Sequence, residues 1–176
     1  MKKLQNLFLP LEGEYLEVRE GKGGYQGKKN ILIYKDARVD MNILDKVVGS
    51  SNWQRKHYEV KGNLYCSVGV YDEDKSDWVW KDDAGAPSNF ESQKGESSDS
   101  FKRACTNWGI GRELYTDAYK GISISLAPNE KTFGWYVKNQ IVEAEVVGVG
   151  IYDSKGNARF RKKYDEKLKK WIEIRS

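Results

Sequence analysis

Histidine and cysteine are almost absent from this chain, and their scarcity argues against several kinds of site. The 176 residues include one histidine, His57, and two cysteines, Cys66 and Cys105. A structural zinc site needs about four Cys or His ligands, so we expect no metal site of this kind. A disulfide between the cysteines stays open, but nothing indicates secretion and we expect two buried free thiols. Nucleophilic catalysis usually needs a histidine base, and no nucleophile motif surrounds His57.

Long apolar runs are also missing. No stretch approaches the roughly 20 apolar residues that span a bilayer, and the N-terminal segment meets acid and proline too early for a signal peptide. Apolar residues make up 39% of the chain, which suits one folded domain with a buried core. We therefore expect a soluble, cytoplasmic protein without a membrane partner.

Charge is nearly balanced over the whole chain but not along it. The net charge is only +4, so any electrostatic argument depends on where the cations gather. From Lys155 onward, the chain contains nine Lys or Arg residues but only three Asp or Glu residues. This basic end is either simply solvated or a partner-binding arm. The sequence indicates a main domain over residues 1–150 and a basic C-terminal hairpin or tail over 151–176.

The first two thirds of the chain predict a hairpin, a helix and a sheet. Residues 21–29 are rich in glycine and favour a turn or hairpin tip, without the spacing of a phosphate-binding loop. A strand over 30–36 follows, and then apolar residues recur at helical spacing until Gly49, a typical helix end. Residues 53–82 alternate with period two and predict an antiparallel meander of three strands.

A second amphipathic helix is expected after a polar loop over residues 84–96. Ser97, Ser98 or Asp99 would cap it and Gly109 would end it. Its apolar stripe consists of Phe101, Ala104, Cys105 and Trp108, so Trp108 is expected in the core. Lys102 and Arg103 then project from the solvent side of the helix.

The rest of the chain predicts a short helical turn and further strands. The stretch over 140–153 is expected as one strand that continues through a turn at 154–157 into another. The end, 166–176, is either a short helix or a tail. The fold class is α+β, an antiparallel meander sheet with helices packed on one face.

Enzymatic signals are weak. Acid clusters at residues 72–74 and at Asp82 and Asp83 are the candidates for Mg²⁺ ligands, but acids in turns usually only solubilise a protein. No nucleotide-binding motif is visible. We expect a protein that is not an enzyme and needs no cofactor.

Several stretches together resemble the Rad-fifty-two-like single-strand annealing superfamily, particularly its bacteriophage members. The similarity lies, in chain order over roughly residues 10 to 120, in the stretches GEYLEVREGKGG, DARVDMNILDKVVGSSNW, NLYCSVGVY and SSDSFKRACTNWGIGRELY. The last resembles the family's Asp-x-x-x-Lys-Arg-Ala helix and its glycine-broken end. Two departures are Thr106, where eukaryotic relatives have a further arginine, and Ser50, where they have an aromatic residue.

The resemblance implies a phage-encoded protein, acting in the bacterial host cytoplasm, that binds single-stranded DNA and anneals complementary strands in recombination and repair without ATP. It also implies a homo-oligomeric ring, arc or filament, working with a single-strand binding protein or an exonuclease. Matching positions place Arg38, Lys102 and Arg103 against the phosphate backbone. Further groove charge is expected from Arg55, Lys56 or Lys94.

The expected mechanism agrees with the physics of annealing. Lys and Arg hold phosphates without sequence preference and leave base edges free to sample a partner. Three other functions stay open: a module that binds double-stranded nucleic acid, a Mg²⁺-dependent nuclease using Asp82 and Asp83, and an assembly protein that ignores nucleic acid.

Overall fold

The computed structural model describes residues 4–86 and 92–174, which form two compact units. The first, which we call the helix–sheet unit, comprises residues Met1–Leu9 and Ala37–Arg112. The second, the large-sheet unit, comprises Pro10–Asp36 and Glu113–Ser176. Each unit is built from two separate chain segments. The expected boundary near residue 150 falls inside a strand of the large-sheet unit.

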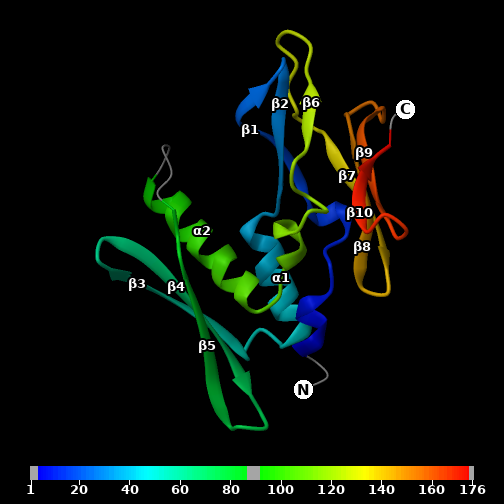
Figure 1. Cartoon of the computed structure of the whole chain (residues 1–176). Coiled ribbons are helices and arrows are strands. Elements are labelled where there is room, and N and C mark those ends of the chain that lie inside the picture. Colours follow the sequence, from blue (N-terminus) through cyan, green and yellow to red (C-terminus); the bar gives the residue numbers. More distant parts are fainter. Residues whose placement is uncertain (1–3, 87–91, 175–176) are drawn as a thin grey trace. The chain divides into compact units, whose positions relative to one another are not determined.

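The helix–sheet unit contains two α-helices, a 3-10 helix and a three-stranded antiparallel sheet (Figure 1). The strands follow the order β3-β4-β5, as the meander pattern predicts. Helix α2 packs across β4 and β5, and α1 packs against α2. The elements of this unit are η1 (Leu4–Phe8), α1 (Ala37–Val47), β3 (Trp53–Val60), β4 (Asn63–Asp72), β5 (Asp77–Ala84) and α2 (Ser92–Asn107).

Strand register divides this sheet into a helix face, on which α2 packs, and an outer face. Val68 is fully buried, and its backbone oxygen accepts a hydrogen bond from Trp108, which directly follows α2, so the residues paired with Val68 lie on the helix face. These are Arg55 of β3 and Lys81 of β5. Neighbouring residues in each strand, such as Lys56, point to the outer face because side chains alternate.

Helix α2 begins at Ser92, earlier than the sequence predicted. The expected loop over 84–96 is therefore wrong for residues 92–96, and the expected caps at Ser97, Ser98 or Asp99 are wrong because these three residues lie inside the helix. Residues 87–91 lie outside the described part of the chain. The error has a physical origin: Ser and Asp are weak helix formers, and their run gives no apolar signal. Here the Ser97 hydroxyl contacts His57 Nε2 at 3.1 Å.

The apolar stripe of α2 is confirmed. Phe101, Ala104 and Cys105 are fully buried, and Trp108 is only 5% exposed. The Trp108 indole N–H donates to the Val68 carbonyl at 2.9 Å, so the ring belongs to the core. Both cysteines are free and buried, as expected.

The large-sheet unit is a seven-stranded sheet in the order β10-β9-β8-β7-β1-β2-β6, and every pairing is antiparallel. Its strands are β1 (Glu17–Tyr25), β2 (Lys28–Tyr34), β6 (Ser123–Ser125), β7 (Tyr136–Val142), β8 (Glu145–Tyr152), β9 (Ala158–Asp165) and β10 (Lys170–Glu173). Two 3-10 helices, η2 (Gly13–Tyr15) and η3 (Arg112–Tyr115), are short, and η3 confirms the predicted helical turn.

One face of this sheet carries the core of the unit. The buried cluster consists of Ile31, Ile122, Ile124, Trp135 and Ile151. Lys162 of β9 points the same way and donates from Nζ to the backbone oxygens of Asp117 and Lys120, at 2.6 and 2.8 Å. A residue of the basic end thus anchors a loop.

Two sequence predictions fail here. The stretch over 140–153 is a hairpin, because the chain reverses at Glu143 and Ala144, which have φ of 49° and 64°. The described part of the predicted C-terminal segment, residues 166–174, is neither a helix nor a tail, since β10 pairs with β9. The α+β class is confirmed, with two antiparallel sheets instead of one. In the described part of the chain, no helix has the length and apolar character to cross a membrane.

Candidate nucleic-acid interface

Arg55 lies on the helix face of the small sheet, where it covers a buried aromatic ring. Its guanidinium carbon sits 4.7 Å from the centroid of Phe101, whose ring also stacks on Trp53 at 6.1 Å. The side chain stays exposed. A guanidinium held over a ring keeps its N–H donors at the edge, so the donors of Arg55 stay available to a further partner.

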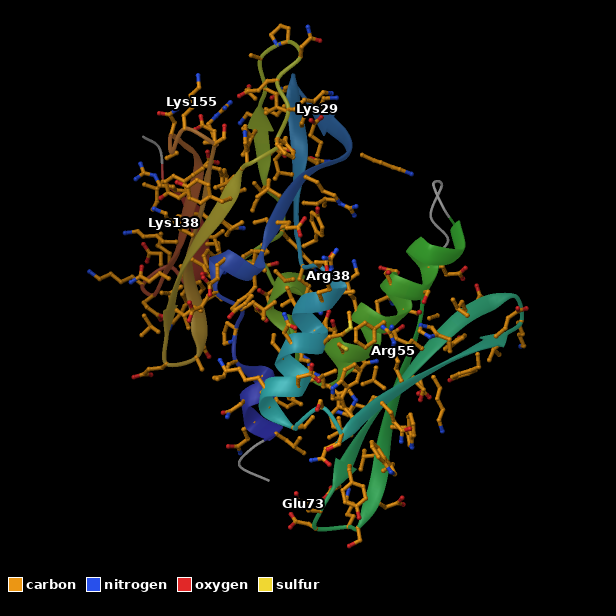
Figure 2. The ribbon with its side chains drawn as sticks, turned by 180° about the vertical axis from the view of Figure 1, so that it is seen from behind. Lys29, Arg38, Arg55, Glu73, Lys138 and Lys155 are labelled. Atoms are coloured by element: carbon orange, nitrogen blue, oxygen red, sulfur yellow. The ribbon has the colours of Figure 1, made fainter. Side chains whose placement is uncertain are left out.

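Arg38 and Lys102 come from the two helices on the same side of the sheet. Arg38 is the second residue of α1 and is exposed, while Lys102 follows Phe101 in α2 and is half-buried. Figure 2 labels Arg38 and Arg55. We call Arg38, Arg55 and Lys102 the helix-side cations. Among the described residues, no ion pair joins a carboxylate to Arg55 or Lys102.

Arg103 is directed elsewhere. Its Nε donates to Asp83 Oδ1 of β5 at 3.2 Å, and its side chain is 44% exposed. Successive residues of a helix are separated by about 100°, so Lys102 leaves α2 on a different side from Arg103. The two neighbouring cations therefore do not form a parallel pair.

Of the remaining two expected site residues, Lys56 is directed away from the helix-side cations, and the side chain of Lys94 is not described. Lys56 points to the outer face of the sheet, where its Nζ lies 4.3 Å from the Trp80 ring centroid. Trp80 rests against Gly69, at which a Cβ atom would come within 2.8 Å of the ring. Lys94 is in the first turn of α2, and its side chain lies outside the described residues.

The C-terminal end of α2 holds two cations that the sequence did not single out. Lys81 donates from Nζ to the Asn107 carbonyl at 2.8 Å, and burial followed by the charge of Arg112 lowers its pKa. Arg112 donates to the carbonyls of Thr106 and Asn107. Both satisfy backbone acceptors at the negative end of the helix dipole. Both residues thus cap the C-terminal end of α2. The sequence did not reveal this role for Lys81, because Lys81 lies far from the end of α2 along the chain.

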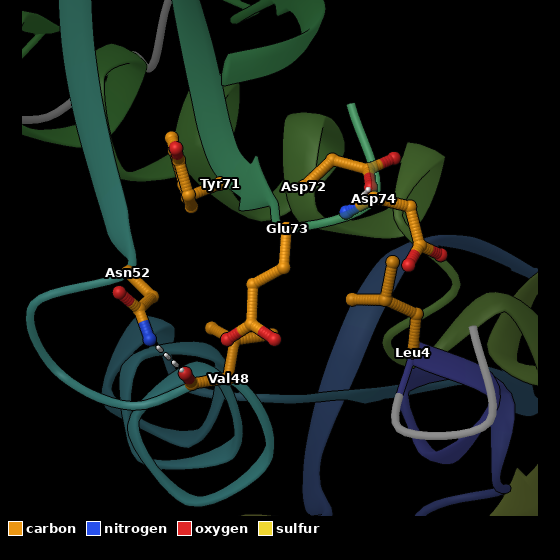
Figure 3. A pocket seen from close by; sticks show the side chains of 7 residues that line it. All are labelled: Leu4, Val48, Asn52, Tyr71, Asp72, Glu73 and Asp74. Carbon is orange, nitrogen blue, oxygen red and sulfur yellow. Dashed lines mark hydrogen bonds between the residues drawn. The ribbon is translucent and has the colours of Figure 1, made fainter. Parts of the chain in front are cut away.

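The described helix–sheet unit also has an acidic pocket (Figure 3). Asp72 and Glu73 line it, and Asp72 Oδ1 accepts hydrogen bonds from the backbone N–H groups of Asp74 and Lys75. Carboxylates repel phosphate, so this pocket does not extend the candidate interface. Its lining residues are Leu4, Val48, Asn52, Tyr71, Asp72, Glu73 and Asp74.

Asp82 and Asp83, the two carboxylates considered for a nuclease, lie on opposite faces of the three-stranded sheet. Asp83 points to the helix face and Asp82 to the outer face, because adjacent strand residues alternate. Within residues 4–86 and 92–174, no group of three His, Cys, Asp or Glu side chains is placed to hold a metal ion together.

Comparison with known proteins adds no family to this geometry. A scan against protein-family models and a search of curated proteins both find no match to the chain.

Proposed function

We propose that the chain binds single-stranded DNA through the helix-side cations and anneals complementary strands without ATP. The observation that carries this proposal is the exposed Arg55 guanidinium, held over Phe101 and left without a carboxylate partner among the described residues. Lys102 of α2 and Arg38 of α1 add positive charge on the same side of the sheet. The resemblance to Rad-fifty-two-like annealing proteins over roughly residues 10 to 120 supports the same activity.

The chemistry of the cations suits this role. Charge neutralisation and counterion release bind any sequence, and contacts to phosphate leave base edges available for pairing. One protomer offers few such contacts, so a functional assembly needs several copies along one strand. We therefore include a homo-oligomer in the proposal, with a single-strand binding protein or exonuclease as its working partner.

An annealing assay tests the proposal. Two complementary oligonucleotides, one with a fluorophore and one with a quencher, are mixed with and without protein, without ATP and without Mg²⁺. We expect the protein to accelerate pairing over the spontaneous rate, and an Arg55→Gln/Lys102→Gln variant to lose most of that acceleration. A rate equal to the spontaneous one would refute the proposal. Competition with unlabelled duplex separates this activity from duplex binding, and strand degradation in Mg²⁺ would instead indicate a nuclease.

A further inference from the structure

The basic residues near the C-terminus lie in strands and divide between the two faces of the large sheet. Lys162 points to the core face, whereas Arg161 and Lys163 point to the opposite face, which we call the open face. Lys163 is exposed, and two apolar residues of the open face, Leu32 and Ile174, remain 44% and 37% exposed. The open face is therefore accessible to solvent.

Aromatic residues form a row across this open face. Strand pairing places Tyr34, Glu17, Tyr136 and Tyr152 opposite one another on β2, β1, β7 and β8. The rings of Tyr136 and Tyr152 stack with centroids 5.5 Å apart and an interplanar angle of 16°. A Cβ atom on Gly150 would lie 2.8 Å from Tyr152 Cε2, so the glycine leaves room for this ring over the strand.

A row of cations runs beside the aromatic row. Lys138 of β7 and Arg161 of β9 flank Gly150, two residues along from Tyr136 and Tyr152, a distance of about 7 Å along a strand. Lys138 Nζ lies 5.2 Å from the Tyr152 centroid, and Figure 2 labels Lys138 on its strand. Lys163 pairs with Gly148, two residues from the pair of Gly150 and Arg161.

Cations outnumber carboxylates on the open face. The cations are Arg19, Lys138, Arg161, Lys163 and Lys170, and the carboxylates are Glu17, Glu145 and Asp165. Glu17 accepts a hydrogen bond from the Tyr34 hydroxyl at 2.6 Å, and Asp165 accepts two from backbone N–H groups of the β9–β10 turn. Glu17 and Asp165 thus already have local partners.

We propose that this open face is a binding site for single-stranded nucleic acid, with bases stacking on Tyr136 and Tyr152 and phosphates contacting Lys138, Arg161 and Lys163. Stacking rings beside a line of cations match an unpaired strand, which presents flat bases and regularly spaced phosphates. An acidic peptide would use the cations but not the rings, and a duplex would present phosphates with its bases covered. The site lies in a different unit from the helix-side cations and does not depend on annealing activity.

Photochemical crosslinking of the full chain tests where the bases lie. The probe is a 30-nucleotide single strand carrying 5-iododeoxyuridine, irradiated at low protein concentration, with crosslinked peptides identified by mass spectrometry. We expect crosslinks at Tyr136 or Tyr152. The absence of crosslinks at both residues would overturn the inference, whether or not other residues react.

Variants measure how much the side chains of the open face contribute to the affinity for a single strand. We expect Lys138→Gln/Lys163→Gln to weaken binding of a labelled single strand about tenfold, and Tyr152→Ala to weaken it roughly fivefold or more. The matched control is Lys155→Gln/Lys167→Gln, which removes the same charge from the two turns beside the face and should leave affinity within about twofold. Equal losses in both double variants would contradict a defined site.

Competition and the helix-side variant keep the two proposals apart. Unlabelled polyglutamate, duplex and single strand are each used as competitors for the crosslinks at Tyr136 and Tyr152. If polyglutamate or the duplex competes as effectively as the single strand, base stacking at these tyrosines is overturned. The Arg55→Gln/Lys102→Gln variant should keep the crosslinks at these tyrosines while losing annealing. Loss of the crosslinks in that variant would contradict an independent site, whereas an inactive wild type with the crosslinks intact would refute only the annealing proposal.

Discussion

Arg103 of α2 and Asp83 of β5 form an ion pair, with Nε 3.2 Å from Oδ1. Asp83 also lies 3.5 Å from Asn107 Nδ2, so its carboxylate links β5 to the end of the helix. The neighbouring Lys102 has no such partner among the described residues. A cation next to a carboxylate offers less net charge to a phosphate than one without, so these adjacent residues should differ in function.

We predict that Lys102→Gln weakens single-strand binding more than Arg103→Gln does. Asp83→Asn should strengthen binding, because it removes a negative charge that lies beside Arg103. Since an exposed ion pair contributes little, Asp83→Asn should change the free energy of unfolding by less than about 1 kcal/mol. Fluorescence anisotropy with a labelled oligonucleotide measures the affinities. A larger loss for Arg103→Gln, or weaker binding by Asp83→Asn, would contradict this assignment.

Trp108 should contribute to stability and not directly to binding. Trp108→Ala removes a buried ring and leaves the Val68 carbonyl without its donor, so we expect a loss of about 3–5 kcal/mol in the free energy of unfolding. Urea unfolding measures this loss. Trp78, half-buried on the outer face, supplies the control, and Trp78→Ala should cost clearly less. A stable Trp108→Ala variant that fails to bind DNA would show that the ring belongs to the interface.

The cysteines should be unreactive in the folded protein. Burial raises the pKa of the Cys66 thiol to about 11 from its ordinary value of 9.0, so almost no thiolate exists at pH 8. Iodoacetamide should label Cys66 and Cys105 only after unfolding, as mass spectrometry can measure. Rapid labelling of the native protein would disprove this burial.

The same shift makes stability depend on pH. A folded-state pKa above the unfolded value means that the Cys66 contribution is complete below about pH 9 and is lost as the pH rises towards 11. Burial also raises the pKa of Tyr119 to about 12, which extends the decline to higher pH. Urea midpoints should therefore fall between pH 9 and 11. The matched variant Cys66→Ala should show a shallower decline, and an identical slope would contradict this origin.

Self-association should accompany strand binding. Because one protomer provides few phosphate contacts, we expect light scattering to give a mass several times the 20.2 kDa protomer. Measurements with and without a long single strand separate intrinsic assembly from assembly on DNA. A strict monomer under both conditions would contradict the proposed oligomer.

The sequence predicted the elements whose signals are local and strong. The helix α1, the stripe through Phe101 and Trp108, and the β3-β4-β5 meander appear as expected, although residues 66–70 of β4 are buried on both faces. The turn at Glu143 and Ala144 was missed because neither residue is the Gly or Asn that two positive φ angles favour. Strand β10 was missed because its pairing with β9 determines it more than its own short pattern does.

The candidate site was predicted only in part, because it also depends on strand pairing and packing that the local sequence does not show. Arg38, Arg55 and Lys102 lie on the helix side of one sheet, but a list of cations does not reveal which face each one takes. Only the β3–β4 register separates Arg55 from Lys56, and only the packing of α2 on β5 brings Arg103 to Asp83. The open face of the large sheet was beyond prediction because its residues come from six strands.

The salt dependence of single-strand affinity tests the central claim most directly. A wild-type plot of the logarithm of affinity against the logarithm of salt concentration should be steep, and Arg55→Gln/Lys102→Gln should reduce its slope by about 1.4, at about 0.7 per lost phosphate contact. An unchanged slope with a folded variant would show that the helix-side cations do not contact the strand, and would contradict the account.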